Sequence, residues 1–198
     1  MSIDDTVAMM KPNYDNYCFS ENKLADCMFN SDMVLYCMKS LILHGVKPKE
    51  IVDPNIRTDF NKLAYLVRLD HGLGENFSVI KEIAEQGEIV TEIVTHFSAL
   101  EMTDVGNFKS LLFYFGLLSI KGVDMMGRPI LHIPNLVVRE QLFNFLIQGY
   151  ARHDIFKLDV NRLRTLFENM SFKGDWKPMF EFLAEAIREQ SRIREYIE

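Results

Sequence analysis

The residues best suited to chemistry stand in three polar stretches of the chain. Residues 14–20 read Tyr-Asp-Asn-Tyr-Cys-Phe-Ser, residues 53–59 read Asp-Pro-Asn-Ile-Arg-Thr-Asp, and residues 133–140 read Ile-Pro-Asn-Leu-Val-Val-Arg-Glu. Arg57 and Arg139 place a guanidinium in the second and third stretches, and this group can grip a phosphate through two parallel hydrogen bonds. We therefore select Arg57 and Arg139 as candidate phosphate or interdomain contacts. For 53–59 the alternative is turn formation and helix capping, and for 14–20 it is a packed connection between helices. The helix at 133–140 stands where a winged helix would read DNA, but Glu140 and Gln141 follow Arg139 directly.

Catalytic and nucleotide-binding motifs are missing from the chain. The dipeptide Gly-Lys of a phosphate-binding P-loop occurs nowhere, and no Gly-x-Ser-x-Gly nucleophile motif is present. Gly72 and Gly74 begin like a dinucleotide-binding turn, but Phe77 stands where the third glycine belongs. The patterns at 21–23 and 175–177 have the acid-x-Lys spacing of a metal-dependent nuclease. The first falls in a loop, and the second falls at the start of a helix that we expect to begin at Asp175. The sequence thus predicts no catalytic residue and no cofactor site in this chain.

Histidines and cysteines follow no metal-binding pattern. The five histidines are scattered without a His-x-x-x-His pair, and the three cysteines, Cys18, Cys27 and Cys37, have no zinc-ligand spacing. An odd number of cysteines leaves at least one thiol unpaired, which favours a reducing, cytoplasmic location. We predict no metal ligands.

Composition and net charge limit the classes of partner that this chain is expected to bind. The chain has 198 residues, of which 48% are hydrophobic and 25% charged, enough for one large domain or two small ones. Its formal net charge of -6 disfavours nucleic acid as the main partner, although a local basic face stays open. The longest apolar run, 111–118, is too short to cross a bilayer, so we expect no membrane insertion.

Periodicity predicts a mainly α protein. A capped, apolar helix begins at Ser31 and ends at Gly45, and further helices follow the 3.6-residue spacing of apolar side chains. Between 103 and 149 the pattern is helix, short β-hairpin, helix, which is typical of a winged-helix module. We expect a helical bundle with a winged-helix-like module containing one short β-hairpin. The expected division is a helical region at 1–100, the winged-helix-like module at 101–152 and C-terminal helices at 153–198.

Six ordered motifs resemble the bacterial AAA-ATPase-like family over nearly the whole chain. They lie at 14–20, 30–33, 53–63, 110–118, 133–140 and 174–178. In that family an N-terminal P-loop domain comes first, then a helical and winged-helix part, and often a PD-(D/E)XK nuclease-like domain. The resemblance implies that this chain corresponds to the middle part, and that its own P-loop and nuclease-like domains are the partners.

The resemblance also implies a function, and it shows which of the family's motifs this chain lacks. The family's Walker A and Walker B residues have no counterpart here, so ATP and Mg²⁺ are implied only for the whole protein. The expected role is a non-catalytic helical lid and winged-helix fragment that couples nucleotide state to a partner or effector domain. The alternative is a stand-alone winged-helix module that binds DNA or another protein.

Overall fold

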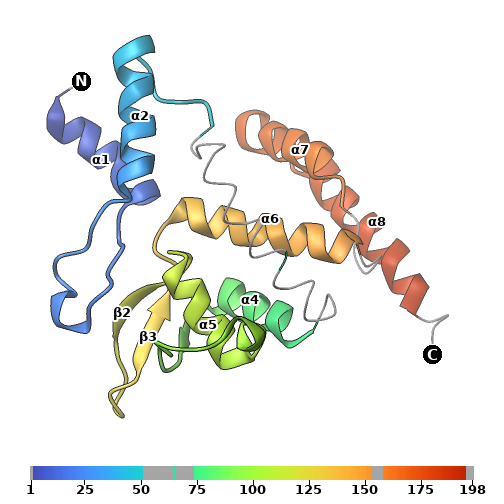
Figure 1. Ribbon diagram of the computed structural model, residues 1–198. Coiled ribbons are helices and arrows are strands. Elements are labelled where there is room, and N and C mark those ends of the chain that lie inside the picture. The colour runs from blue at the N-terminus through green and yellow to red at the C-terminus, as the bar shows by residue number, and fades with distance from the viewer. Residues whose placement is uncertain (1, 51–64, 66–73, 153–157, 195–198) are drawn as a thin grey trace. The chain divides into compact units, whose positions relative to one another are not determined.

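The chain forms two compact units in the computed structural model. The units are Met1–Leu146 and Ile147–Glu198, and the structure describes residues 2–50, 65, 74–152 and 158–194 (Figure 1). The prediction of three parts, 1–100, 101–152 and 153–198, stays a prediction.

Two helices begin the first unit. Helix α1 (Ile3–Tyr14) starts at a reciprocal cap, in which the Ser2 hydroxyl accepts from the Asp5 amide at 3.1 Å and the Asp5 carboxylate accepts from the Ser2 amide at 3.0 Å. Helix α2 (Ser31–His44) is capped by the Asn30 side chain and stops at Gly45, as its sequence predicts. Their apolar faces meet in a cluster made of Met10, Tyr14, Met33 and Cys37, to which Val137 from a later helix is added.

The rest of the first unit alternates helices with short strands. Its elements are α4 (Glu75–Gln86), β1 (Glu88–Val90), η2 (Ala99–Glu101), α5 (Val105–Tyr114), β2 (Ser119–Val123), β3 (Pro129–His132) and the start of α6 (Leu136–Arg152). The strands form an antiparallel sheet in the order β1-β3-β2, and α4 packs against α5 and β1 (Figure 1). A mainly α fold with a small β element is confirmed.

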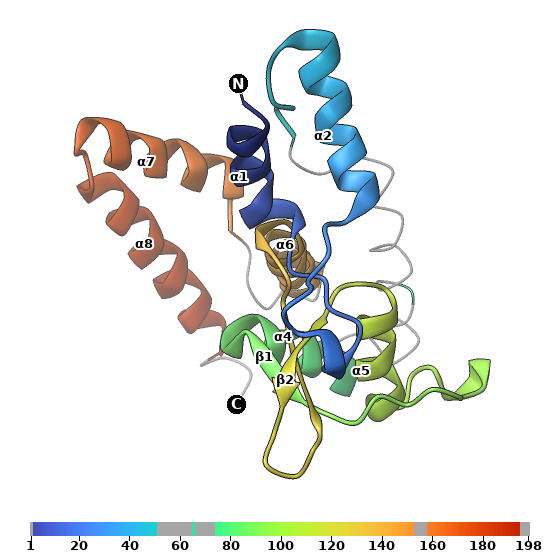
Figure 2. The same ribbon diagram turned by 90° about the vertical axis from the view of Figure 1, so that its left-hand side faces the viewer.

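The hairpin turn explains why β2 and β3 pair. The Asp124 carboxylate accepts from the Met126 and Arg128 amides at 2.9 and 2.8 Å, and Gly127 has a φ of 77°, which suits glycine. The Arg128 guanidinium also forms an ion pair with the Asp124 carboxylate at 2.7 Å. The tip presents Met125 and Met126, which are almost fully exposed, and the hairpin projects from its neighbours in Figure 2.

Apolar side chains from the helices α4, α5 and α6 and from the three strands make the main core. The most completely buried are Ile80, Ile83, Phe108, Leu112, Leu118, Leu131, Val137 and Leu142. The 3.6-residue spacing places them on one face of each helix, and the strands contribute alternate residues. Between α4 and α6, the rings of Phe77 and Phe145 lie 6.2 Å apart. The core therefore fixes the start of α6 against α4 and the sheet.

The second unit contains an antiparallel helix pair, α7 (Val160–Lys173) and α8 (Lys177–Arg194), together with the last turns of α6. The Asp159 side chain caps α7, and Gly174 ends it in the left-handed region. The Arg162 guanidinium lies 4.8 Å from the ring centre of Phe182, which ties the two helices together.

Three details differ from the sequence prediction. A third strand, β1, pairs with the predicted hairpin. The sequence does not indicate this strand, because three residues are too few to show an alternating pattern. Helix α6 continues past Gly149 to Arg152, and α8 begins at Lys177 rather than at Asp175. Helix ends shift in this way because a single glycine or acid biases a boundary without fixing it. Among the described helices, none combines the length and apolar character that crossing a bilayer requires.

His132 gives the sheet a pH-dependent stability. It lies in the central strand, opposite Glu88 and Ser119. Burial lowers the pKa of His132, and nearby Lys121 lowers it further, while Glu88 opposes them. Because an unfolded histidine titrates near 6.5, protonation favours the unfolded chain as the pH falls below about 6.5. We expect urea midpoints to fall between pH 7 and pH 5, and His132→Gln to reduce that fall. An unchanged pH profile in His132→Gln would contradict this origin.

Candidate functional site

The connection between α1 and α2 is anchored to β2 by one buried serine. The Ser119 hydroxyl accepts from the Cys18 amide and donates to the carbonyl of Asn16, each at 2.7 Å. The Ile120 amide donates to the Cys18 carbonyl at 3.0 Å, so this connection runs along the outer edge of the sheet. Asn16 adopts a φ of 73°, a left-handed conformation that asparagine tolerates. Residues about a hundred positions apart are thereby held together.

Asn135 joins the same connection to the start of α6. Its side-chain oxygen accepts from the Val138 amide at 3.1 Å and so caps the helix, while its nitrogen donates to the Asp15 carbonyl at 3.1 Å. Burial raises the pKa of Tyr17, whereas side-chain hydrogen bonds with Asn135 and Asn30 oppose the increase. Two of the polar stretches chosen from sequence, 14–20 and 133–140, therefore meet at Asn135.

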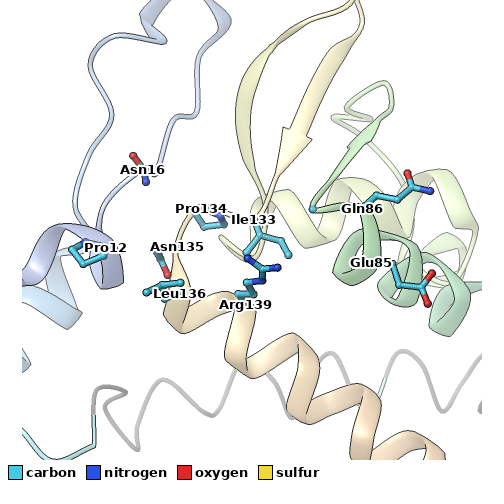
Figure 3. A pocket seen from close by; sticks show the side chains of 10 residues that line it. Pro12, Asn16, Glu85, Gln86, Ile133, Pro134, Asn135, Leu136 and Arg139 are labelled. Atoms are coloured by element: carbon cyan, nitrogen blue, oxygen red, sulfur yellow. The ribbon is translucent and has the colours of Figure 1, made fainter. Parts of the chain in front are cut away.

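An open pocket of about 500 Å³ lies beside this junction. Its lining residues are Pro12, Asn16, Glu85, Gln86, Gly87, Ile133, Pro134, Asn135, Leu136 and Arg139. In Figure 3 the Arg139 side chain points from α6 toward Ile133, with Asn16 to one side and Glu85 and Gln86 on the other. The pocket is thus lined by the end of α1 and the connection after it, by the end of α4, and by the start of α6 with the residues just before it.

The pocket lining contains two charged side chains of opposite sign, Arg139 and Glu85. Arg139 is exposed, and its guanidinium lies 5.9 Å from the ring centre of Phe143, one turn along α6. Within the described ranges of the chain, Arg139 has no ion-pair partner. Glu85 supplies the opposite charge and forms a long ion pair with Lys81 at 3.9 Å. The pocket therefore offers a cation and, across from it, a carboxylate.

The main hydrogen-bond donor on the Arg139 side of the pocket is the guanidinium of Arg139. The first turn of an α-helix has amides without partners inside the helix, and its dipole favours an anion. At α6 the Asn135 side chain takes up the Val138 amide, and Arg139 adds its guanidinium one turn later. This arrangement can bind a carboxylate or a phosphate. Among the described residues, no group of three or more His, Cys, Asp or Glu side chains could hold a metal ion.

The two arginines selected from sequence have different outcomes. Arg139 lines the pocket, whereas Arg57 and the whole stretch 53–59 lie outside the described residues. Sequence reasoning did not select Glu85 and Gln86, which line the pocket from the end of α4. No local signal marks these two residues, because exposed polar side chains in the last turn of a helix are ordinary.

Comparisons of the chain with protein-family models, with curated proteins and with solved structures found no match. The resemblance to the AAA-ATPase-like family is therefore still a prediction.

Proposed function

We propose that this chain is a non-catalytic helical and winged-helix part of an AAA-ATPase-like protein, in which the Arg139 pocket receives an anionic group. The observation that supports this most directly is Arg139, which has no ion-pair partner among the described residues and lies beside the start of α6. The natural occupants are a nucleotide phosphate or a carboxylate of an adjoining domain. The whole protein would supply the P-loop, ATP and Mg²⁺, in the cytoplasm, and a nuclease-like domain would be one effector.

The element order supports the winged-helix part of this proposal. Helix α4, strand β1, helix α5 and the β2–β3 hairpin follow one another, and β1 pairs with the second hairpin strand. The hairpin would be the wing. Helix α6 leaves this module directly after the hairpin and contributes Val137, Val138 and Leu142 to the core. A change at the Arg139 pocket would therefore act on a helix that is firmly packed in the module.

Duplex DNA is a weaker candidate for the partner. On the hairpin, Lys121 forms an ion pair with Glu88, and Arg128 forms one with Asp124. Either cation would have to give up its ion pair before it could bind a DNA phosphate. Helix α5, next to the hairpin in sequence, has Lys109 as its only charged residue. A DNA-binding face normally gathers several unpaired cations. Duplex binding that weakens steeply with added salt would favour the stand-alone DNA-binding alternative.

The exposed hairpin tip favours a protein contact as a second candidate function. Met125 and Met126 project into solvent, and flexible methionine side chains suit apolar protein surfaces. For the ATPase-like protein, this tip would be where the module touches its effector. Changing both residues to Gln should change the free energy of unfolding by no more than about 0.5 kcal/mol and abolish cross-linking of the tip to the effector domain. Unchanged cross-linking would remove this candidate.

We expect the Arg139 pocket to bind pyrophosphate or ATP weakly in the isolated chain. In nitrogen-15 NMR titrations, the Arg139 Nε–Hε signal and the Asn135 side-chain amide should shift together. Arg139→Gln should weaken binding about tenfold to a hundredfold, because a charge-assisted hydrogen bond contributes about 1.5–3 kcal/mol. Both signals come from side chains that line the pocket, so they report binding there and not a general effect of charge on the surface.

A matched control lies further along the same helix. Arg152 bonds to Gln148 at 3.3 Å and does not line the pocket, so Arg152→Gln should leave the titration unchanged. Equal weakening by both variants would indicate general electrostatics and contradict a defined site. In the whole protein, Arg139→Gln should also lower ATP turnover, and unchanged turnover together with unchanged affinity would rule out the lid role.

A further inference from the structure

Two cysteines lie opposite each other where the α1–α2 connection folds back on itself. Tyr17 and Met28 form an antiparallel bridge and exchange both backbone hydrogen bonds, at 3.0 and 2.9 Å. The next pair inward is Cys18 and Cys27. Tyr17–Met28 is an isolated bridge. In a regular antiparallel ladder, the pair next to such a hydrogen-bonded pair is the non-hydrogen-bonded kind, whose Cα atoms lie about 4.5 Å apart. That spacing falls within the range that a disulfide spans, about 4.4–6.8 Å.

The surroundings of the two thiols differ. Cys18 is 2% exposed, and its thiol donates to the carbonyls of Ser20 and Lys23 at 3.2 and 3.5 Å. Cys27 is exposed, and its thiol donates to the Leu24 carbonyl at 3.5 Å. Both sulfurs therefore face the same short turn, which includes the 3₁₀ helix η1 (Glu21–Lys23).

The pKa of the Cys27 thiol reflects the Cys18 side chain beside it. Desolvation raises the pKa of Cys27, and the Cys18 thiol raises it further through charge and a side-chain hydrogen bond. The Asp15 carboxylate acts in the same direction. Cys27 is consequently protonated near neutral pH, and its attack on a disulfide should become faster as the pH rises, because the thiolate is the nucleophile.

We propose that Cys18 and Cys27 form a reversible intramolecular disulfide that closes residues 19–26 into a loop when a small-molecule disulfide is present. Cys27 is the accessible partner and reacts first. Its thiolate attacks the small disulfide, forms a mixed disulfide and releases one small thiol. The Cys18 thiolate then attacks the Cys27 sulfur and releases the second small thiol. The two protein thiols lose two electrons and two protons, and the small disulfide takes them up as two thiols.

The remaining cysteine is placed for packing instead. Cys37 is buried on α2 within the cluster formed with Met10, Tyr14, Met33 and Val137. Its thiol and the Tyr14 hydroxyl share a hydrogen bond. Cys37 therefore belongs to the contact between α1 and α2, whereas Cys18 and Cys27 share the turn beside β2.

The disulfide would act at the rim of the Arg139 pocket. Cys18 follows Asn16 by two residues, and Ser119 holds both of their backbones on β2. Closing the loop would fix Phe19, whose ring contacts Phe113 with centres 5.6 Å apart. Because the redox chemistry needs no ligand in the pocket, this inference does not depend on the function proposed above.

The test is oxidation of the purified full chain with oxidised glutathione, followed by alkylation in denaturant and mass measurement. The reduced chain should take up three alkyl groups, one on each of its cysteines, and the oxidised monomer one. Trypsin spares the bond between Lys11 and Pro12 but cuts after Lys23 and Lys39. Peptides 1–23 and 24–39 should therefore stay joined until a reductant is added.

Single variants assign the bond. Peptide 24–39 contains both Cys27 and Cys37, so Cys37→Ser should keep the linkage and Cys27→Ser should lose it. Cys27 is exposed, and its replacement should not disturb folding. The rate should rise about tenfold per pH unit below the pKa of the attacking thiol. A linkage that persists in Cys27→Ser, or oxidation that yields only disulfide-linked dimers, would overturn the proposal.

Discussion

Replacing Phe108 with alanine should bring the first unit close to unfolding. Phe108 is fully buried on α5, and truncating a buried phenylalanine costs about 3–5 kcal/mol through lost apolar burial and the cavity that remains. Small domains are stable by only about 5–15 kcal/mol, so this one change removes a large share. Urea unfolding followed by circular dichroism should show a lower midpoint with an unchanged slope.

Phe172 provides the matched control for this experiment. It is 87% exposed on α7, so Phe172→Ala removes the same atoms without opening a cavity. We expect it to change the free energy of unfolding by no more than about 0.5 kcal/mol. Similar losses in the two variants would show that Phe108 does not lie in the main core.

The second large effect is expected at Asn135. Asn135→Ala removes the cap of α6, which is worth about 1 kcal/mol, and leaves buried polar partners unpaired at a cost of about 1–3 kcal/mol. The expected loss of unfolding free energy is therefore about 2–4 kcal/mol. Because the Asp15 carbonyl loses its donor, amides of residues 15–18 should also exchange hydrogen faster in the folded chain.

A cap without tertiary contacts separates the two contributions. Asp159 caps α7 through the Arg162 amide at 3.0 Å and is exposed. Asp159→Ala should cost about 1 kcal/mol and leave exchange at residues 15–18 unchanged. If Asn135→Ala costs no more than Asp159→Ala, Asn135 serves only as a cap and does not hold the α1–α2 connection.

The pocket and the thiol pair share one structural cause, which is the attachment of residues 14–20 to β2 and α6. Ser119 and Asn135 are both buried polar residues that use their hydrogen-bonding capacity on that connection. Buried polar groups of this kind specify one arrangement of the chain, since any other would leave them unpaired. The connection therefore has a fixed place beside the sheet.

The sequence by itself determined the local elements of this protein. Asn30 and Gly45 bound α2, Gly174 ends α7, and the turn from Asp124 to Gly127 closes the hairpin. These signals act within a few residues, because capping and turn formation satisfy backbone groups next to the side chain that provides them. The periodic apolar residues likewise indicated a mainly α fold and much of its core.

Only the tertiary structure decided which distant residues meet. The pairing of β1 with β3, the hydrogen bond from Asn135 to Asp15 and the gathering of Glu85, Gln86 and Arg139 around one pocket join separate parts of the chain. Such contacts depend on which distant segments the folded backbone brings together, and a sequence pattern that spans a few residues does not specify this. Arg139 was therefore visible from sequence as a cation, whereas its partners in the pocket were not.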